Sequence, residues 1–151
     1  MEATDLMIGD WVQSFGEPHK IIGIKTDTPY PYIKTNMSDT WYEWGMKDLA
    51  DGIPLTPEIL EKNGFVKEEF KESPYVDWYK LVYSAYPNKE TELVEVNIVK
   101  ENNEIVGIAC AKMMHTNQRL FRIEKYREMN IYVHELQHAL RLCGIEKEIE
   151  L

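Results

Sequence analysis

The sequence has few of the features that mark several large classes of protein. It contains two cysteines, too few for a disulfide-based scaffold, and neither lies in a CxxC pair or a zinc-ligand spacing. Its longest apolar run, Ile105–Ala111, is too short to span a bilayer. A hydrophobic share of 44% and a charged share of 28% are ordinary for a globular domain, which argues against disorder.

Basic residues are also scarce, since 17 Lys and Arg stand against 26 Asp and Glu, for a net charge of −9. Nucleic-acid binders owe much of their affinity to a basic face that neutralises phosphates. This chain has no basic run, so its average field repels nucleic acids and anionic membranes. An acidic nucleic-acid mimic is kept as an alternative, although the carboxylates are scattered rather than arranged in rows.

The N-terminal residues Met1–Asp5 are acidic and lack the charged-then-apolar order of a signal peptide. Cys110 and Cys143 lie in apolar stretches, and we expect both to be buried free thiols in a reducing compartment. The predicted location is therefore cytoplasmic.

Residues 1–55 have the pattern of a small β-barrel-like module. A Gly9-Asp10 turn signal precedes the β-prone pair Trp11-Val12, and further strands are predicted over Lys20–Ile24, from Tyr32, and over Trp41–Trp44. We also expect a turn at residues 16–18. Short strands at this spacing predict an SH3-like barrel.

Residues 56–151 are predicted to form an α+β module that opens with a short helix over 57–63. Thr56 is a good N-cap, and Pro57 suits the first helical position because its missing N–H costs nothing there. Gly64 is placed to adopt the left-handed conformation that ends many helices, which lets Phe65 fold back onto the helix.

The region from about 76 to 123 alternates with period two, as antiparallel strands do. Val94, Val96 and Ile98 share one predicted strand face. Residues 101–104, Glu-Asn-Asn-Glu, suit a hairpin to a return strand over 105–113. We therefore expect a meander of about four strands, with the last helix, at about 130–143, packed on it. The predicted fold class is α+β.

The last helix carries His134-Glu135-Leu136-Gln137-His138. Histidines four residues apart on a helix can reach one metal ion, and the glutamate is placed to activate a metal-bound water. This stretch resembles the HExxH motif of the zincin metalloproteases. The resemblance implies His134 and His138 as zinc ligands and Glu135 as the catalytic base.

The context of this motif predicts no zinc site. Catalytic zinc needs a third protein ligand, and the extended zincin motif would require glycine at 141 and histidine at 144, where the chain has Arg141 and Gly144. Only thirteen residues follow His138, and an upstream ligand such as His115 would need a different topology. Helical projection places both histidines on the outer face, away from an apolar stripe that includes Leu136 and Leu140. We therefore expect no cofactor, with zinc as the alternative.

The aromatic residues Trp41 and Trp44 have two interpretations. They either form part of the core of the small barrel, which is the commoner role, or bind a protein partner. A non-enzymatic accessory protein that binds a protein partner is the leading functional hypothesis, ahead of a minimal zinc-dependent peptidase and of the acidic nucleic-acid mimic.

Three stretches, Asp5–Val12, Ile53–Phe65 and Tyr132–Ile145, resemble a family of small uncharacterised proteins of gut Bacteroidales bacteria and their phages or prophages. The resemblance implies a phage, mobile-element or host setting. It implies nothing about chemistry.

Overall fold

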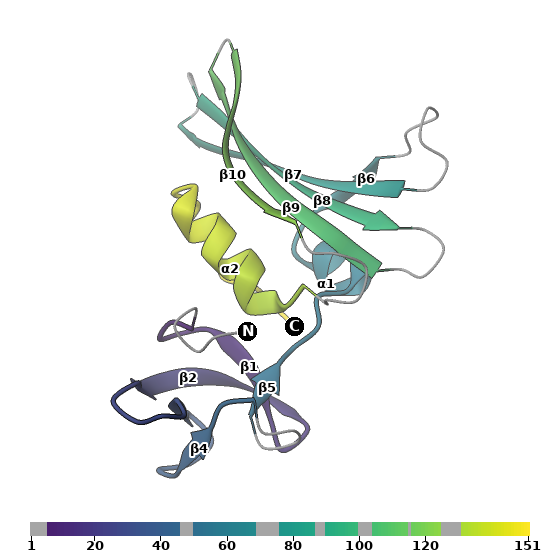
Figure 1. Ribbon diagram of the computed structural model, residues 1–151. Coiled ribbons are helices and arrows are strands. Elements are labelled where there is room, and N and C mark those ends of the chain that lie inside the picture. The colour runs from purple at the N-terminus through teal and green to yellow at the C-terminus, as the bar shows by residue number, and fades with distance from the viewer. Residues whose placement is uncertain are drawn as a thin grey trace. The chain divides into compact units, whose positions relative to one another are not determined.

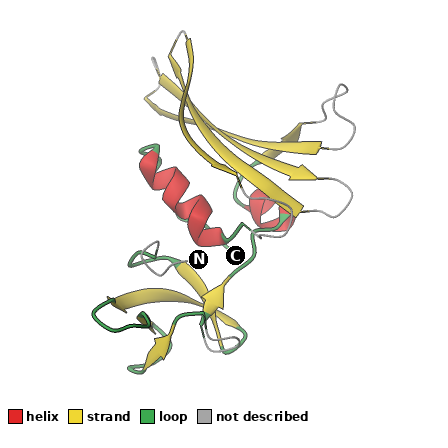
Figure 2. Ribbon diagram, in the orientation of Figure 1, coloured by secondary structure: helices red, strands yellow, loops and turns green. Residues whose placement is uncertain are grey.

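The computed structural model describes residues 6–45, 50–68, 76–86, 90–99, 104–114, 116–124 and 131–151. Strands predominate, and the C-terminal element is a helix (Figure 2), which confirms the α+β class. The elements in chain order are β1 Trp11–Ser14, β2 Glu17–Lys25, β3 Tyr32–Thr35, β4 Trp41–Glu43, β5 Asp51–Gly52, α1 Pro57–Lys62, β6 Val66–Glu68, β7 Val76–Tyr86, β8 Glu90–Val99, β9 Glu104–Met114, β10 Thr116–Glu124 and α2 Val133–Leu142. Within the described residues, neither helix is long and apolar enough to cross a membrane.

The chain divides into two compact units. The first contains Met1–Ile53 together with Tyr132–His134, and the second contains Pro54–Ile131 and Glu135–Leu151. The chain therefore returns to the first unit for three residues just as α2 begins.

The first unit is built on an antiparallel sheet with strand order β4-β3-β2-β1-β5. Its inner face holds the fully buried side chains of Val12, Ile21 and Ile33, which alternate with outward-facing residues along their strands. The Gly45 N–H donates to the Ala50 carbonyl at 2.9 Å between β4 and β5. The described strands form a sheet without barrel closure, so the SH3-like barrel stays a prediction.

The turn between β1 and β2 differs from the sequence prediction. Ser14 pairs with Glu17, so the turn is the two-residue Phe15-Gly16, and β2 already includes Pro18. Both turn residues have positive φ, 52° for Phe15 and 80° for Gly16, as a type I′ hairpin requires. The Phe15 ring packs edge-on against Tyr42 with 5.2 Å between ring centroids.

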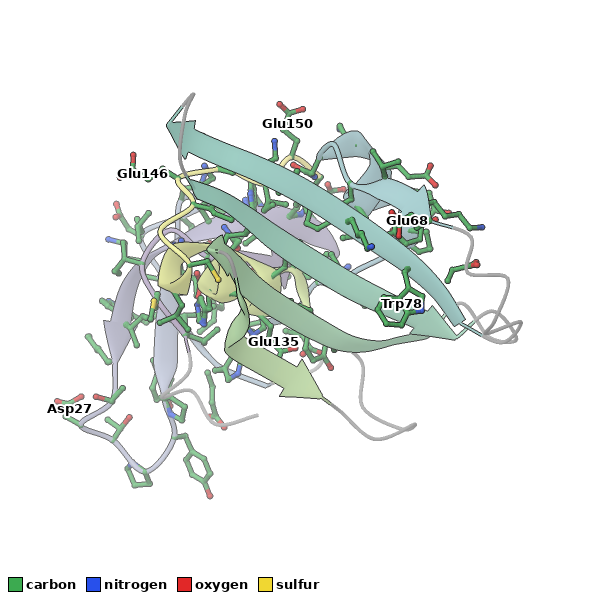
Figure 3. The ribbon with its side chains drawn as sticks, turned by 90° about the horizontal axis from the view of Figure 1, so that it is seen from above. Asp27, Glu68, Trp78, Glu135, Glu146 and Glu150 are labelled. Atoms are coloured by element: carbon green, nitrogen blue, oxygen red, sulfur yellow. The ribbon has the colours of Figure 1, made fainter. Side chains whose placement is uncertain are left out.

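The second unit contains the sheet β10-β9-β8-β7-β6, in which every neighbouring pair is antiparallel. The predicted four-strand meander is thus confirmed as β7–β10, with β6 added at the β7 edge. Tyr79 and Leu81 are buried and pair in register with Val96 and Val94. The sheet curves over α2 (Figure 1), and Trp78 lies on the opposite face of the sheet (Figure 3).

Helix α1 has the predicted caps. The Thr56 hydroxyl accepts a hydrogen bond from the Ile59 N–H, and Pro57 occupies the first turn. At the other end Gly64 has φ of 83°, and the Phe65 N–H donates to the Leu60 carbonyl at 3.0 Å. This is the Schellman arrangement, in which the residue after the glycine folds back onto the helix.

Helix α2 ends in the same way. The Gly144 N–H donates to the Arg141 carbonyl at 3.0 Å, and the Ile145 N–H donates to the Leu140 carbonyl at 2.9 Å. Leu140 and Ile145 are both buried, so the cap adds an apolar contact to its hydrogen bonds. The helix begins at Val133, and the predicted start at residue 130 lies outside the described residues.

The C-terminal tail is fastened to the end of α1 by Asn63. The Asn63 amide donates to the Ile59 carbonyl at 2.8 Å and to the Glu150 carbonyl at 2.7 Å, and it accepts from the Glu150 N–H at 2.9 Å. The Lys62 ammonium donates to the Leu151 carbonyl. Asn63 is buried, and this pairing spans 87 residues of sequence.

Tyr79 joins β7 to α1 within the second unit. Its hydroxyl donates to a carboxylate oxygen of Glu61 at 3.0 Å. Burial raises the pKa of the Tyr79 hydroxyl, and the negative charge and hydrogen bond of Glu61 raise this pKa further, because both favour the protonated phenol.

The prediction of free thiols is wrong for Cys143, which is disulfide-bonded. The chain has one other cysteine, Cys110 in β9, and both belong to the second unit. Spacing along the sequence carried no sign of this bond, because the two cysteines approach each other only after the meander and α2 have formed.

Candidate functional site

The first histidine of the HExxH motif is a core residue, not the exposed residue that helical projection predicts. His134 is fully buried in the first unit. Its ring stacks on Tyr132, with centroids 5.7 Å apart and planes at 10°, and it meets Trp44 edge-on at 6.2 Å. Projection assumed that α2 packs on one side only, whereas its first turn is covered by aromatic residues of the first unit.

The segment before His134 is held against β5. The Val133 N–H donates to the Ile53 carbonyl at 2.9 Å. The Tyr132 ring lies directly over Gly52, where a Cβ atom would come within 2.5 Å of the ring. Only glycine leaves room for this ring, so Gly52 fixes Tyr132, and Tyr132 in turn forms one wall around His134.

The other two motif residues have different surroundings. Glu135 and His138 are partly exposed and belong to the second unit, while the intervening Leu136 and Gln137 are buried. In Figure 3, Glu135 lies near the β10 side of the second unit. The two histidines lie one helical turn apart, as predicted, but one is enclosed by aromatic rings and the other reaches solvent.

These residues do not fit a catalytic zinc centre. Such a centre needs three protein ligands and an open position for water. Among the residues that the structure describes, no group of three His, Cys, Asp or Glu side chains is placed to hold a metal ion. The burial of the His134 imidazole between Tyr132 and Trp44 also leaves no open side for a water. His115, the alternative upstream ligand, lies outside the described residues.

The two candidate protein-binding tryptophans lie on opposite faces of the first sheet. Trp44 is 9% exposed and belongs to the core cluster with Ile33 and Ala50, so it offers little surface. Trp41 is half-buried on β4 and pairs with Lys34 on β3. Of the two, Trp41 alone contributes a substantial surface.

The register groups further residues around Trp41. Trp11 pairs with Lys20, Gly23 pairs with Lys34, and Lys25 lies two positions along the same strand face as Gly23. Because paired residues project to the same side of a sheet, all of these lie on the outer face. We call this surface the tryptophan–lysine face, and it consists of Trp11, Lys20, Lys25, Lys34 and Trp41.

Lysines on this face lie over its aromatic rings. The Lys25 ammonium is 4.0 Å from the centroid of a Trp41 ring, and the Lys20 ammonium is 5.0 Å from a Trp11 ring. The Trp41 indole extends across β3 to β2, where a Cβ on Gly23 would lie 2.8 Å from its Cη2 atom. A cation–π contact holds an ammonium in place without cancelling its charge.

One carboxylate outside the strands responds to this face. Asp39 contacts Lys34 at 2.6 Å, and the hydrogen bond and positive charge of Lys34 lower the pKa of the Asp39 carboxyl. Sequence reasoning singled out Trp41 but missed Trp11 and the three lysines. The alternating positions of Lys20 and Lys25 relative to the buried Ile21 carried a weak signal, which the bulge between Ile21 and Gly23 obscured.

No family model, curated protein or solved structure matches the chain.

Proposed function

We propose that the protein is a non-enzymatic accessory protein that binds a protein partner through the tryptophan–lysine face. The observation that carries this proposal is the pair of half-buried tryptophans, Trp11 and Trp41, on the outer side of a sheet whose inner side holds the core. Tryptophan is enriched among the residues that contribute most to protein–protein affinity.

The other apolar surface of the first unit supports the same proposal. Phe15 at the β1–β2 turn is 51% exposed, and Tyr30 in the loop before β3 is 62% exposed. The positive φ of Phe15 is uncommon for a bulky residue and costs about 1–2 kcal/mol. Glycine or asparagine would relieve this cost, so we attribute the retention of an exposed phenyl ring at this turn to binding.

The architecture and setting that we propose follow the sequence predictions. The strand order β4-β3-β2-β1-β5 and the hydrogen bond between Gly45 and Ala50 support an SH3-like barrel for the first unit. The resemblance of the three sequence stretches to proteins of gut Bacteroidales and their phages supports a phage or mobile-element setting.

The sequence favours the cytoplasm, whereas a disulfide at Cys143 is typical of an oxidising compartment. Thiol alkylation in intact native cells followed by mass spectrometry distinguishes these locations. Reduced Cys110 and Cys143 support the cytoplasm, and a disulfide-bonded pair supports an oxidising compartment.

Crosslinking in native cells tests the proposed function. A photo-crosslinking amino acid at Gln13, an exposed neighbour of Trp11 on β1, should capture a protein partner. Trp41→Ala should abolish this product, whereas Tyr30→Ala, which removes an exposed aromatic ring outside the face, should leave it unchanged. Thermal melts of each variant confirm folding. Absence of a crosslinked protein with the unaltered face, or a product that is insensitive to Trp41→Ala, would contradict the proposal.

A further inference from the structure

The charge of the tryptophan–lysine face is opposite to that of the whole protein. The net charge of the chain is −9, yet every lysine among the described residues of the first unit, Lys20, Lys25 and Lys34, lies on this face. Two carboxylates share the outer side, Glu43 on the edge strand β4 and Asp51 on the edge strand β5. The centre of the face is therefore basic, and its two borders are acidic.

The lysines are held where a ligand would meet them. The Lys25 ammonium lies 4.0 Å from the Trp41 ring centroid and the side chain is exposed, so its N–H groups can reach a ligand while the ring restrains its position. Lys20 has the same relation to Trp11 at 5.0 Å. Each pair offers a carboxylate-binding ammonium next to an apolar ring edge.

We infer that this face binds an acidic peptide segment of the partner, in which carboxylates alternate with apolar side chains. The inference rests on the proposed function and adds the chemistry of the partner. Carboxylates of the segment contact Lys20 and Lys25, and its apolar side chains contact the indole rings. The acidic borders at Glu43 and Asp51 repel a longer polyanion and so limit the charged contact to the centre of the face.

The same geometry disfavours single-stranded nucleic acid, the other ligand that combines negative charge with planar groups. Proteins that bind single strands stack bases on open aromatic faces. On Trp41 the Lys25 ammonium lies over a ring face, and Gly23 contacts the Cη2 edge. A base could stack on Trp41 only after displacing Lys25, and the net charge of −9 adds a further penalty.

Fluorescence anisotropy with short labelled peptides tests the inference. The probes are a peptide that alternates glutamate with leucine, the same peptide with glutamine in place of glutamate, and an oligothymidylate. The purified full-length protein should bind the glutamate peptide at least about tenfold more tightly than the glutamine peptide at low salt, and this preference should shrink as salt screens the charges.

The variant Lys25→Gln should weaken the glutamate peptide about threefold to fivefold and leave the glutamine peptide unchanged, as expected for one exposed ion pair. Lys147→Gln, in the C-terminal tail, is the matched control and should change neither affinity. Equal binding of the two peptides, no binding of the glutamate peptide, or no effect of Lys25→Gln would overturn the inference. Tighter binding of the oligothymidylate would replace it with nucleic-acid binding.

The crosslinking experiment separates this inference from the proposed function. A partner that is lost with Trp41→Ala but retained at full yield with Lys25→Gln would leave the proposed function standing and remove the acidic segment.

Discussion

Asn63 connects the two ends of the second unit, and its substitution gives the sharpest test of how the C-terminal tail is held. The amide makes three hydrogen bonds, two as donor and one as acceptor, and the side chain is buried. A typical intramolecular hydrogen bond contributes about 1 kcal/mol net, and a buried group left unpaired costs more. Asn63→Ala should therefore lower the free energy of unfolding by about 3 kcal/mol, at all pH values where the protein is folded.

Asn63→Asp should behave differently, because it keeps the acceptor and replaces the donor. The second carboxyl oxygen would face the Ile59 carbonyl at 2.8 Å and the Glu150 carbonyl at 2.7 Å. Ionisation of the introduced carboxyl is then disfavoured, so its folded pKa lies above the ordinary aspartate value of about 3.9. The unfolded chain loses this proton first as pH rises, so the variant should be nearly native in stability below about pH 4 and should lose stability above it.

Thermal melts across pH provide the assay. A loss of about 3 kcal/mol corresponds to a fall of about 6–12 °C in Tm for a chain of this length. The control is Asn36→Ala, because Asn36 accepts a single exposed hydrogen bond from the Lys20 N–H and its loss should cost below about 1 kcal/mol. A pH-independent Asn63→Asp, or an Asn63→Ala no less stable than the control, would refute the reasoning.

Three further predictions concern the site and the second unit. His134→Ala should cost about 3 kcal/mol, because it removes a buried ring packed between aromatic residues, whereas His138→Ala should cost below about 0.5 kcal/mol; a zinc centre would instead lose metal equally in both, which metal analysis of untagged protein detects. Reduction or Cys143→Ser should lower stability by about 3–4 kcal/mol if the bond closes the loop of about 34 residues back to Cys110, and an unchanged denaturation midpoint would contradict this. Because the folded pKa of Tyr79 is raised, its contribution is present below about pH 10 and is lost as pH rises through the folded value; alkaline denaturation should be less steep in Tyr79→Phe.

The local structure could be predicted where a few neighbouring residues decide it. Thr56 and Pro57 begin α1, and Gly64 ends it, because each meets a backbone requirement that other residue types meet poorly. The same reasoning applies at Gly144, where a second Schellman cap ends α2. Alternation of apolar residues likewise predicted β8, and adjacency in sequence predicted its pairing with β9.

The first sheet shows where such reasoning becomes imprecise. A glycine next to a proline suggested a turn at residues 16–18, but the hairpin turns one residue earlier because Phe15 adopts a positive φ. Sequence patterns assign a bulky aromatic residue to a strand rather than to a type I′ turn, so this choice could not be read from composition. The face that carries the proposed function then depends on register, which moves every side chain to the other side when it shifts by one residue.

The HExxH motif failed as a guide for a related reason. A five-residue match fixes the relative direction of two side chains on a helix but not what covers them. The surroundings of His134 come from Trp44, ninety residues earlier, and from Tyr132, which is held in place by Gly52. Because each of these contacts requires the first sheet to be already formed, the motif can be distinguished from a metal site only at the tertiary level. The stability difference between the two histidine variants therefore measures the same long-range packing that no local pattern encodes.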